Sequence, residues 1–282
     1  MNSATILAID VHAHYGIINR AGGDPLADGF MSKSAGQVAQ NAHNLGIELT
    51  LVSPLAGLFP RGQADAVAAN EAAFREVPAA PGLRQYVIVN PLQSRTFDQA
   101  RVMLKAPWCL GIKIHPEEHR YKIADQGARL FAFFEEVHKP VMTHSGCPNS
   151  LPKDFVPFAD SHPDVRLLLA HLGNGAGDGN KVDLQVRAVQ ASRHGNIWID
   201  TSSSRNVLPG LVEWAVQEVG AERLLFGSDA PLYHLAMQRA RIDAADIPLE
   251  AKRLILRGNA LKYFNLTDTA KSANQWNKSA IQ

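Results

Sequence analysis

The chain has 282 residues, of which 46% are hydrophobic and 20% are charged, and its formal net charge is +1. This is the composition of a soluble globular protein, with enough residues for one large α/β domain or two small ones. A near-neutral charge without a block of Lys or Arg gives no sign of a nucleic-acid or membrane-surface partner.

The start of the chain shows no basic segment followed by an apolar core, so no secretory signal is visible. No uncharged apolar segment reaches the length that spans a membrane. The two cysteines, Cys109 and Cys147, form neither a zinc-ribbon spacing nor a disulfide framework. We therefore expect a cytoplasmic protein.

Short apolar runs recur along the chain, and each ends in polar or small residues. The first reads TILAIDV, and most of the runs are separated by stretches of helical period, for example 62–77, 123–139 and 206–220. Strands that alternate with helices predict βαβ units and a parallel sheet. The eight predicted strands are 5–11, 48–54, 84–91, 109–116, 140–146, 165–173, 196–202 and 223–229.

Eight such units in under 300 residues predict a closed (β/α)8 TIM barrel, which we assign to residues 1–264 as a single domain. The helical segment 257–266 would be its closing helix, and the polar tail 265–282 would be partly disordered or draped over the surface. The alternative is an open doubly wound sheet. That fold normally carries a glycine fingerprint after the first strand, where this chain has His-Ala-His-Tyr-Gly.

Histidines gather where the predicted strands end. His12 and His14 follow the first strand and, like Asp10, should point to one face because side chains alternate along a strand. In a barrel, that face would be the cavity at the C-terminal mouth. The other strand ends carry Lys113 and His115 (fourth), His144 (fifth), His171 (sixth) and Asp229 (eighth).

Imidazoles and a carboxylate that converge at one mouth form a ligand set for Zn²⁺ or another divalent metal. A single buried histidine is more often an ordinary hydrogen-bonded side chain. Several of them at corresponding strand ends, with a His-x-His pair among them, favour the metal site.

The order of these residues resembles the amidohydrolase superfamily. The wording AIDVHAHYG, GIKIHP, MTHSG, LLLAHLGN and LLFGSDAP resembles its amidohydrolase-related branch of metal-dependent hydrolases and aminocarboxymuconate semialdehyde decarboxylase-like enzymes. The resemblance implies that His12, His14, His144 and Asp229 bind the metal. It also implies that His171 is either a second-metal ligand or an acid/base group.

The resemblance leaves the number of metals open. We expect one divalent ion, with zinc as the first choice and manganese or another divalent metal as alternatives. A two-metal site bridged by a carboxylated Lys113 is the other possibility, whereas an unmodified Lys113 would bind an anionic substrate.

The expected reaction is hydrolysis of a C–N or C–O bond in a small amide, lactone or ester. A metal lowers the pKa of its bound water toward neutrality, Asp229 would accept the water proton, and His171 would stabilise the developing charge. A non-oxidative decarboxylase of a small unsaturated or aromatic carboxylate is the alternative, and a non-catalytic metal- or ligand-binding barrel is the second alternative.

The loops after the strands should form the pocket for this small-molecule substrate. The segment 15–33, which contains Arg20, is expected to be a mobile cover, and we expect Lys113, His115 and Arg205 to contact substrate. A homodimer through the outer helices is possible by analogy with resembling proteins.

Overall fold

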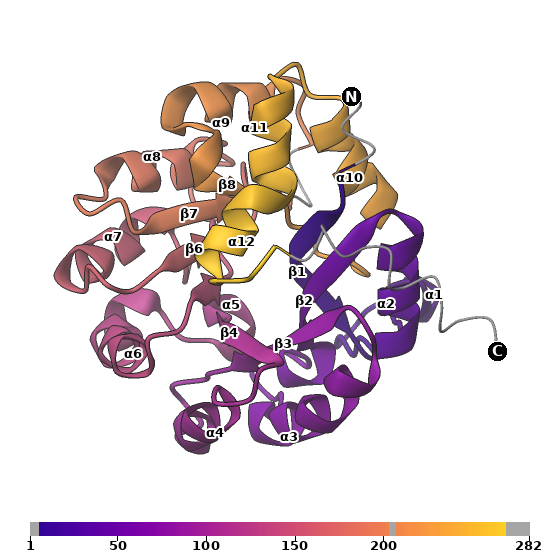
Figure 1. Cartoon of the computed structure of the whole chain (residues 1–282). Coiled ribbons are helices and arrows are strands. Elements are labelled where there is room, and N and C mark those ends of the chain that lie inside the picture. Colours follow the sequence, from indigo (N-terminus) through magenta and orange to yellow (C-terminus); the bar gives the residue numbers. More distant parts are fainter. Residues whose placement is uncertain (1–5, 203–206, 269–282) are drawn as a thin grey trace.

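The computed structural model describes residues 6–202 and 207–268, in which eight strands form one sheet with helices around it (Figure 1). The strands follow one another around the sheet in chain order, and each pairs in parallel with the next. They are β1 Ala8–Tyr15, β2 Ile47–Pro54, β3 Leu83–Ile88, β4 Cys109–Ile114, β5 Val141–Thr143, β6 Leu167–Leu169, β7 Ile197–Asp200 and β8 Leu224–Leu225.

The helices connect these strands and cover the outside of the sheet (Figure 1). They are α1 Pro25–Phe30, α2 Ala35–Asn44, α3 Ala66–Glu76, α4 Arg95–Met103, α5 Pro116–His119, α6 Ile123–Val137, α7 Pro152–Ser161, α8 Leu184–Ala191, α9 Leu211–Val219, α10 Leu235–Asp243, α11 Leu249–Arg253 and α12 Asn259–Tyr263. Short 3-10 segments lie at Leu55–Gly57 (η2), Val77–Ala79 (η3) and Ala221–Arg223 (η4), and a π-helical turn, η5, spans Leu254–Gly258.

The sheet closes on itself through contacts between β1 and the segment that begins with β8. The backbone N–H of Val11 donates to Phe226 O over 2.9 Å, and the N–H of His14 donates to Ala230 O. Ala13 and Ala230 form a parallel bridge at the same seam. The architecture is therefore the expected (β/α)8 barrel, and the open doubly wound sheet is excluded.

The strands are buried on both faces, as their nearly continuous apolar runs predict. Inside the barrel, Leu51, Tyr86, Met142 and Leu168 pack together. Residues of the opposite parity, such as Leu169, pack against the surrounding helices. Polar side chains thus have few places left in the interior, apart from the ends of the strands.

The closing segment seals the end of the barrel at which the strands begin. Tyr263 and Phe264 are buried against the interior residues, and Leu261 packs beside them. The Tyr263 hydroxyl donates toward Arg166 O at 2.8 Å and Val141 O at 3.2 Å. The opposite end of the barrel is the mouth at which the strands end.

The position of Asp10 differs from the expectation. The pairing of β1 with β2 shifts register between Asp10 and Ala13, so simple alternation fails there. Val11 packs inside the barrel, while Asp10 accepts hydrogen bonds from the hydroxyl and the N–H of Ser228, at 2.5 and 3.0 Å. Asp10 therefore supports the chain beside the histidines and does not share their face.

Two of the predicted helices begin later than their sequence pattern suggests. The segment 62–77 becomes helical only at Ala66, because the Asp65 side chain caps the helix by accepting from Ala68 N at 3.0 Å. The segment 206–220 becomes helical at Leu211, directly after Gly210 in the left-handed region (φ 78°). None of the helices in the described ranges combines the length and apolar composition needed to cross a membrane.

Candidate metal centre

Six strand ends bring their polar side chains to one mouth of the barrel. The residues come from β1 (His12, His14), the end of β4 (Lys113), the turns after β5 and β6 (His144, His171), the end of β7 (Asp200) and the turn after β8 (Asp229). All are buried except His144, which is partly exposed. The structure therefore places the strand-end residues that the sequence pattern singled out at one mouth, together with Asp200.

His12 is held in one tautomer by its two neighbours. Its Nδ1–H donates to Asp200 Oδ2 over 2.8 Å, because a carboxylate can only accept. Its Nε2 accepts from Lys113 Nζ, also over 2.8 Å. The lone pair of Nε2 is therefore the one directed toward the centre of the site.

His14 is held in the same way. Its Nδ1 lies 3.0 Å from the hydroxyl and 3.2 Å from the carbonyl oxygen of Ser53; the carbonyl can only accept, so a proton on Nδ1 is the arrangement that satisfies both oxygens. Its Nε2 then faces Asp229 Oδ1 at 3.0 Å, and His12 Nε2 lies 3.4 Å from the same oxygen. Two imidazole lone pairs and a carboxylate oxygen meet at one point.

The protonation states agree with this picture. Burial lowers the pKa of both His12 and His14, which keeps these rings neutral. Burial by itself would raise the pKa of Asp229, but the positive charge that His12, His14 and His171 carry when protonated outweighs burial and lowers this pKa. When the rings are neutral, a bound cation would favour the carboxylate in their place. Asp229 Oδ1 is buried and has no hydrogen-bond partner among the described residues.

His12 Nε2 already accepts from Lys113 Nζ, but His14 Nε2 and Asp229 Oδ1 face each other with no proton between them, which is unfavourable unless a cation binds there. Neutral imidazole nitrogens and a carboxylate oxygen are ordinary ligands of divalent metals such as Zn²⁺ and Mn²⁺. His12, His14 and Asp229 therefore fit a divalent metal, because their ligand atoms lie within 4.8 Å of one another.

Asp200 is a functional residue that the sequence pattern did not reveal. Its Oδ1 accepts from His171 N, Ser202 N and the Ser202 hydroxyl, while its Oδ2 accepts from His12. It ends β7 and shares the parity of Trp198, which packs toward the barrel interior. This inward orientation is the signal from which Asp200 could have been found, because an inward-facing carboxylate at the end of a strand lies at the mouth of the barrel.

His12, His171 and Asp200 form a second group whose ligand atoms lie close together. Here, however, the hydrogen bonds of Asp200 already satisfy both of its oxygens. This group needs no cation, which distinguishes it from the group of His12, His14 and Asp229.

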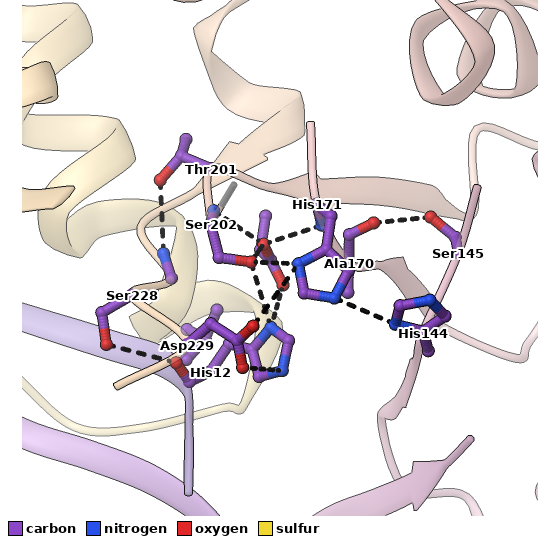
Figure 2. Close-up of polar contacts among 12 residues, drawn as sticks. His12, His144, Ser145, Ala170, His171, Thr201, Ser202, Ser228 and Asp229 are labelled. Atoms are coloured by element: carbon purple, nitrogen blue, oxygen red, sulfur yellow. Dashed lines mark hydrogen bonds and ion pairs between the residues drawn. The ribbon is translucent and has the colours of Figure 1, made fainter. Parts of the chain in front are cut away.

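His171 lies between the metal-ligand candidates and His144 (Figure 2). Its Nε2 is 3.0 Å from His144 Nδ1, its Nδ1 is 2.9 Å from the Ser202 hydroxyl, and its Nδ1 is 4.0 Å from Asp229 Oδ2. The other ring nitrogen of His144 is 3.2 Å from Cys147 Sγ. His144 thus joins the cluster through His171 and is not in direct contact with His12 or His14 through any hydrogen bond of the described residues.

The backbone is unusual at two of these positions. His171 (φ 71°) and Asp229 (φ 57°) occupy the left-handed region, which is uncommon for residues other than glycine. Such conformations cost roughly 1–3 kcal/mol and are concentrated at functional sites. The turns after β6 and β8 therefore hold their side chains inward at an energetic cost.

A cavity of about 850 Å³ opens over this cluster and is lined by His12, His14, His144, His171 and Asp229. His115 belongs to its wall, with its ring stacked on His144 at a centroid distance of 4.4 Å. The segment 15–33 contributes Ile18, Arg20 and Met31 to the wall and contains α1, and its role as a mobile cover stays a prediction. Arg205, the remaining candidate for substrate contact, lies outside the described residues.

A comparison with protein-family models shows to which family the chain belongs. A family model described as amidohydrolase matches residues 9–266, which include β2 to β8, β1 from Ile9 onward and the candidate metal ligands from His12 to Asp229. The chain belongs to the amidohydrolase family. No match was found among curated protein sequences.

Solved structures of low sequence identity share the fold. A 2,6-dihydroxybenzoate decarboxylase from Rhizobium aligns with TM-score 0.71 and 16% identity, covering 92% of this chain and 98% of that one. A dihydroxybenzoic acid decarboxylase from Polaromonas sp. JS666, solved with bound manganese, aligns with TM-score 0.68 and 15% identity over 92% and 96%. A 5-carboxyvanillate decarboxylase from Novosphingobium aromaticivorans, complexed with manganese, aligns with TM-score 0.69 and 14% identity over 93% and 97%.

At this identity the similarity establishes the barrel and its extent. The amidohydrolase barrel of this chain spans nearly the full length of each of these proteins, so no large part of their fold is missing from it.

Proposed function

We propose that this amidohydrolase-family chain is a metal-dependent, non-oxidative decarboxylase of a small aromatic or unsaturated carboxylate. The donor set of the site supports the metal. The observation that carries the choice of reaction is the full-length similarity to decarboxylase structures, among which two different aromatic carboxylic acids are represented.

We propose that one divalent ion is held by His12, His14 and Asp229, with His144 completing the set as the family resemblance implies. Two of the similar structures contain manganese, so manganese stands beside zinc as a candidate. When bound, the ion would supply Lewis-acid chemistry that polarises an oxygen of the substrate. A two-metal site with a carboxylated Lys113 is the competing proposal, and metal counting separates the two.

Lys113 is suited to attract the carboxylate of the substrate. It is almost fully buried behind His12, with Nζ 2.8 Å from His12 Nε2, and burial lowers its pKa to about 8. A cationic group in such a water-poor place interacts strongly with an incoming anion. His115 on the cavity wall would contact the same molecule.

His171 and Asp229 can manage the proton of this reaction. In a decarboxylation the C–C bond to the carboxylate breaks, CO₂ leaves, the electron pair stays on the former neighbour carbon, and a proton is added there. His171 Nδ1 and Asp229 Oδ2 lie 4.0 Å apart, too far for a direct hydrogen bond, so we propose that each acts on the substrate and that one of them delivers the proton to the carbon.

Hydrolysis of a lactone, ester or amide is the second candidate function. The family description favours it, and the same acid/base pair would accept a proton from water and return it to the leaving group. The two reactions differ in their products, so a single assay can decide between them.

The assay uses protein loaded with manganese or with zinc and a panel of hydroxybenzoates, unsaturated carboxylates, lactones and amides. The proposal expects CO₂ release from at least one carboxylate, lost on chelation and restored by metal. Hydrolysis without CO₂ release would assign the chain to the hydrolases. Metal binding without turnover of either kind would leave the non-catalytic barrel.

A further inference from the structure

One wall of the cavity is made of two loops that are fastened to each other. Arg61 donates to both oxygens of Glu118, at 3.0 and 2.7 Å, and the N–H of Gly62 donates to the carbonyl oxygen of Glu118 at 2.6 Å. The ring of His119 donates from Nε2 to the carbonyl oxygen of Gly57 at 2.8 Å. The loops after β2 and β4 therefore form a single, well-held surface.

Arg120 follows α5 on this wall in a conformation that is unusual for arginine. Its φ of 57° places it in the left-handed region, where its N–H bonds to the carbonyl oxygens of Glu117 and Pro116. This region costs an L-residue with a side chain roughly 1–2 kcal/mol, and glycine or asparagine would be the ordinary choice. An arginine here is explained by the place to which the turn brings its side chain.

Gly62 makes room for that side chain. A Cβ atom at Gly62 would lie 2.6 Å from Cδ and 2.9 Å from Nε of Arg120. The stem of Arg120 thus lies against the backbone of Gly62, and Arg120 is part of the cavity wall. The contact with Gly62 lays the stem of this exposed side chain along the wall.

The charge of Arg120 is the one that remains unmatched. Of the arginines that line the cavity, Arg20 forms an ion pair with Asp28, and Arg61 forms one with Glu118. Within residues 6–202 and 207–268, the guanidinium of Arg120 has no ion pair and no hydrogen bond. A guanidinium presents five donors in a planar fork that matches a carboxylate.

We propose that Arg120 binds a second anionic group of the substrate, remote from the carboxylate at the metal site. The substrate class is then a small dicarboxylate with an aromatic or apolar body, which Leu58, Phe59 and Leu232 on the cavity wall would contact. This inference rests on the proposed function for the position of the first carboxylate.

Binding of unreactive probes tests the inference without turnover. Benzoate and isophthalate share a ring and differ by one carboxylate, and each is titrated calorimetrically into metal-loaded protein. Wild type should bind isophthalate roughly 10- to 100-fold more tightly than benzoate, the range expected for a hydrogen-bonded charge pair. Arg120→Ala should lose this preference with benzoate affinity changed by less than about 2-fold, and Arg120→Lys should retain part of it.

The control is Arg95→Ala, which removes an exposed arginine of α4 and should change neither affinity. Equal affinity of wild type for the two probes, failure to bind isophthalate, or an equal loss of both affinities in Arg120→Ala would overturn the inference. Thermal melts of Arg120→Ala and Arg120→Lys show whether both are folded before titration.

The inference and the proposed function fail in different ways. If isophthalate binding depends on Arg120 but no carboxylate releases CO₂, the dicarboxylate site stands and the decarboxylase is wrong. If CO₂ is released from a monocarboxylate and a dicarboxylate with equal kcat/KM in wild type and in Arg120→Ala, the decarboxylase stands and the role of Arg120 is wrong.

Discussion

A single carboxylate oxygen of Asp229 shows most directly why the site suits a cation. Asp229 Oδ1 is buried, has no hydrogen-bond partner among the described residues, and faces the unprotonated Nε2 atoms of His12 and His14. The neighbours of the two imidazoles fix which nitrogen of each ring faces inward, so rotation of protons alone cannot relieve the contact. A divalent cation restores the balance of charge at this point.

Asp229→Asn should therefore have opposite effects on the metal-free and the metal-loaded protein. An asparagine can donate from Nδ2 to His14 Nε2, so the metal-free variant should be about 1 kcal/mol more stable than metal-free wild type. Turnover by the loaded protein should fall roughly 1000-fold or more, because the ligand and the proton-transfer group are both lost. Denaturant unfolding with and without chelator measures the first effect. A metal-free variant less stable than wild type would contradict this account.

Asp200 would act on a bound metal through His12. Its Oδ2 accepts the Nδ1–H of His12, which keeps the lone pair on Nε2. Asp200→Asn should weaken metal affinity about 10- to 100-fold, the usual effect of removing such a partner. Competition with a chromogenic chelator gives the affinity. Asp98→Asn, an exposed carboxylate on α4, serves as the control, and equal affinities of the two variants would refute the role of Asp200.

At the scale of elements, the space available for a side chain differs from position to position along a barrel strand. Gly111 in the middle of β4 lies where a Cβ would come within 2.7 Å of Pro140 O and 3.0 Å of the Tyr86 ring. The same ring of Tyr86 packs against Phe264 of the closing segment, at a centroid distance of 6.2 Å. A glycine in this strand is therefore required by the large aromatic residue that fills the barrel.

Gly111→Ala should destabilise the protein by about 1–3 kcal/mol, because backbone and a buried ring must both move. Gly36→Ala is the matched control. Gly36 is an exposed helical residue of α2, and a methyl group added there would meet no atom within 4 Å, so alanine should stabilise the protein by about 0.5 kcal/mol. Urea denaturation of both variants checks the contrast in sign. A neutral Gly111→Ala would show that the closing segment yields more easily than its packing indicates.

At the scale of the whole molecule, the candidate metal site lies on the seam that closes the barrel. His12 and His14 belong to β1, whereas Asp229 follows β8, and β8 itself has only two residues. The seam is held by backbone bonds such as Ser228 N–H to His12 O, at 3.1 Å, and by the bridge of Ala13 with Ala230. A bound ion would join both sides of this seam.

Removal of the metal should therefore loosen the seam more than the rest of the sheet. Chelation should lower Tm by roughly 5–15 °C, as expected for the loss of a tightly bound ligand. Amide hydrogen exchange should rise at Val11, His14 and Ser228, and it should change little at Gln85 and Val89 between β3 and β4. A uniform rise across all strands would contradict a local effect of the ion. The homodimer and the cytoplasmic location stay predictions.

The sequence by itself determined the alternation of strands and helices, the closed barrel and the residues at the strand ends. Long apolar runs bury themselves on both faces, and a polar residue after such a run can lie only at the mouth, so His12, His14, His171 and Asp229 were readable from their positions. Their convergence required no knowledge of contacts, only of the parallel order of the strands.

The orientation of Asp10, the hydrogen-bond partners of the histidines and the space around Arg120 were decided by the tertiary structure alone. The register shift in β1 turns Asp10 away from the histidines, and the fold pairs Asp200 with His12 across 188 positions of sequence. It also brings Gly62 against the stem of Arg120. Periodicity encodes which face of an element a side chain occupies, but hydrogen-bond partners and room for a side chain depend on distances between elements, which no local pattern contains.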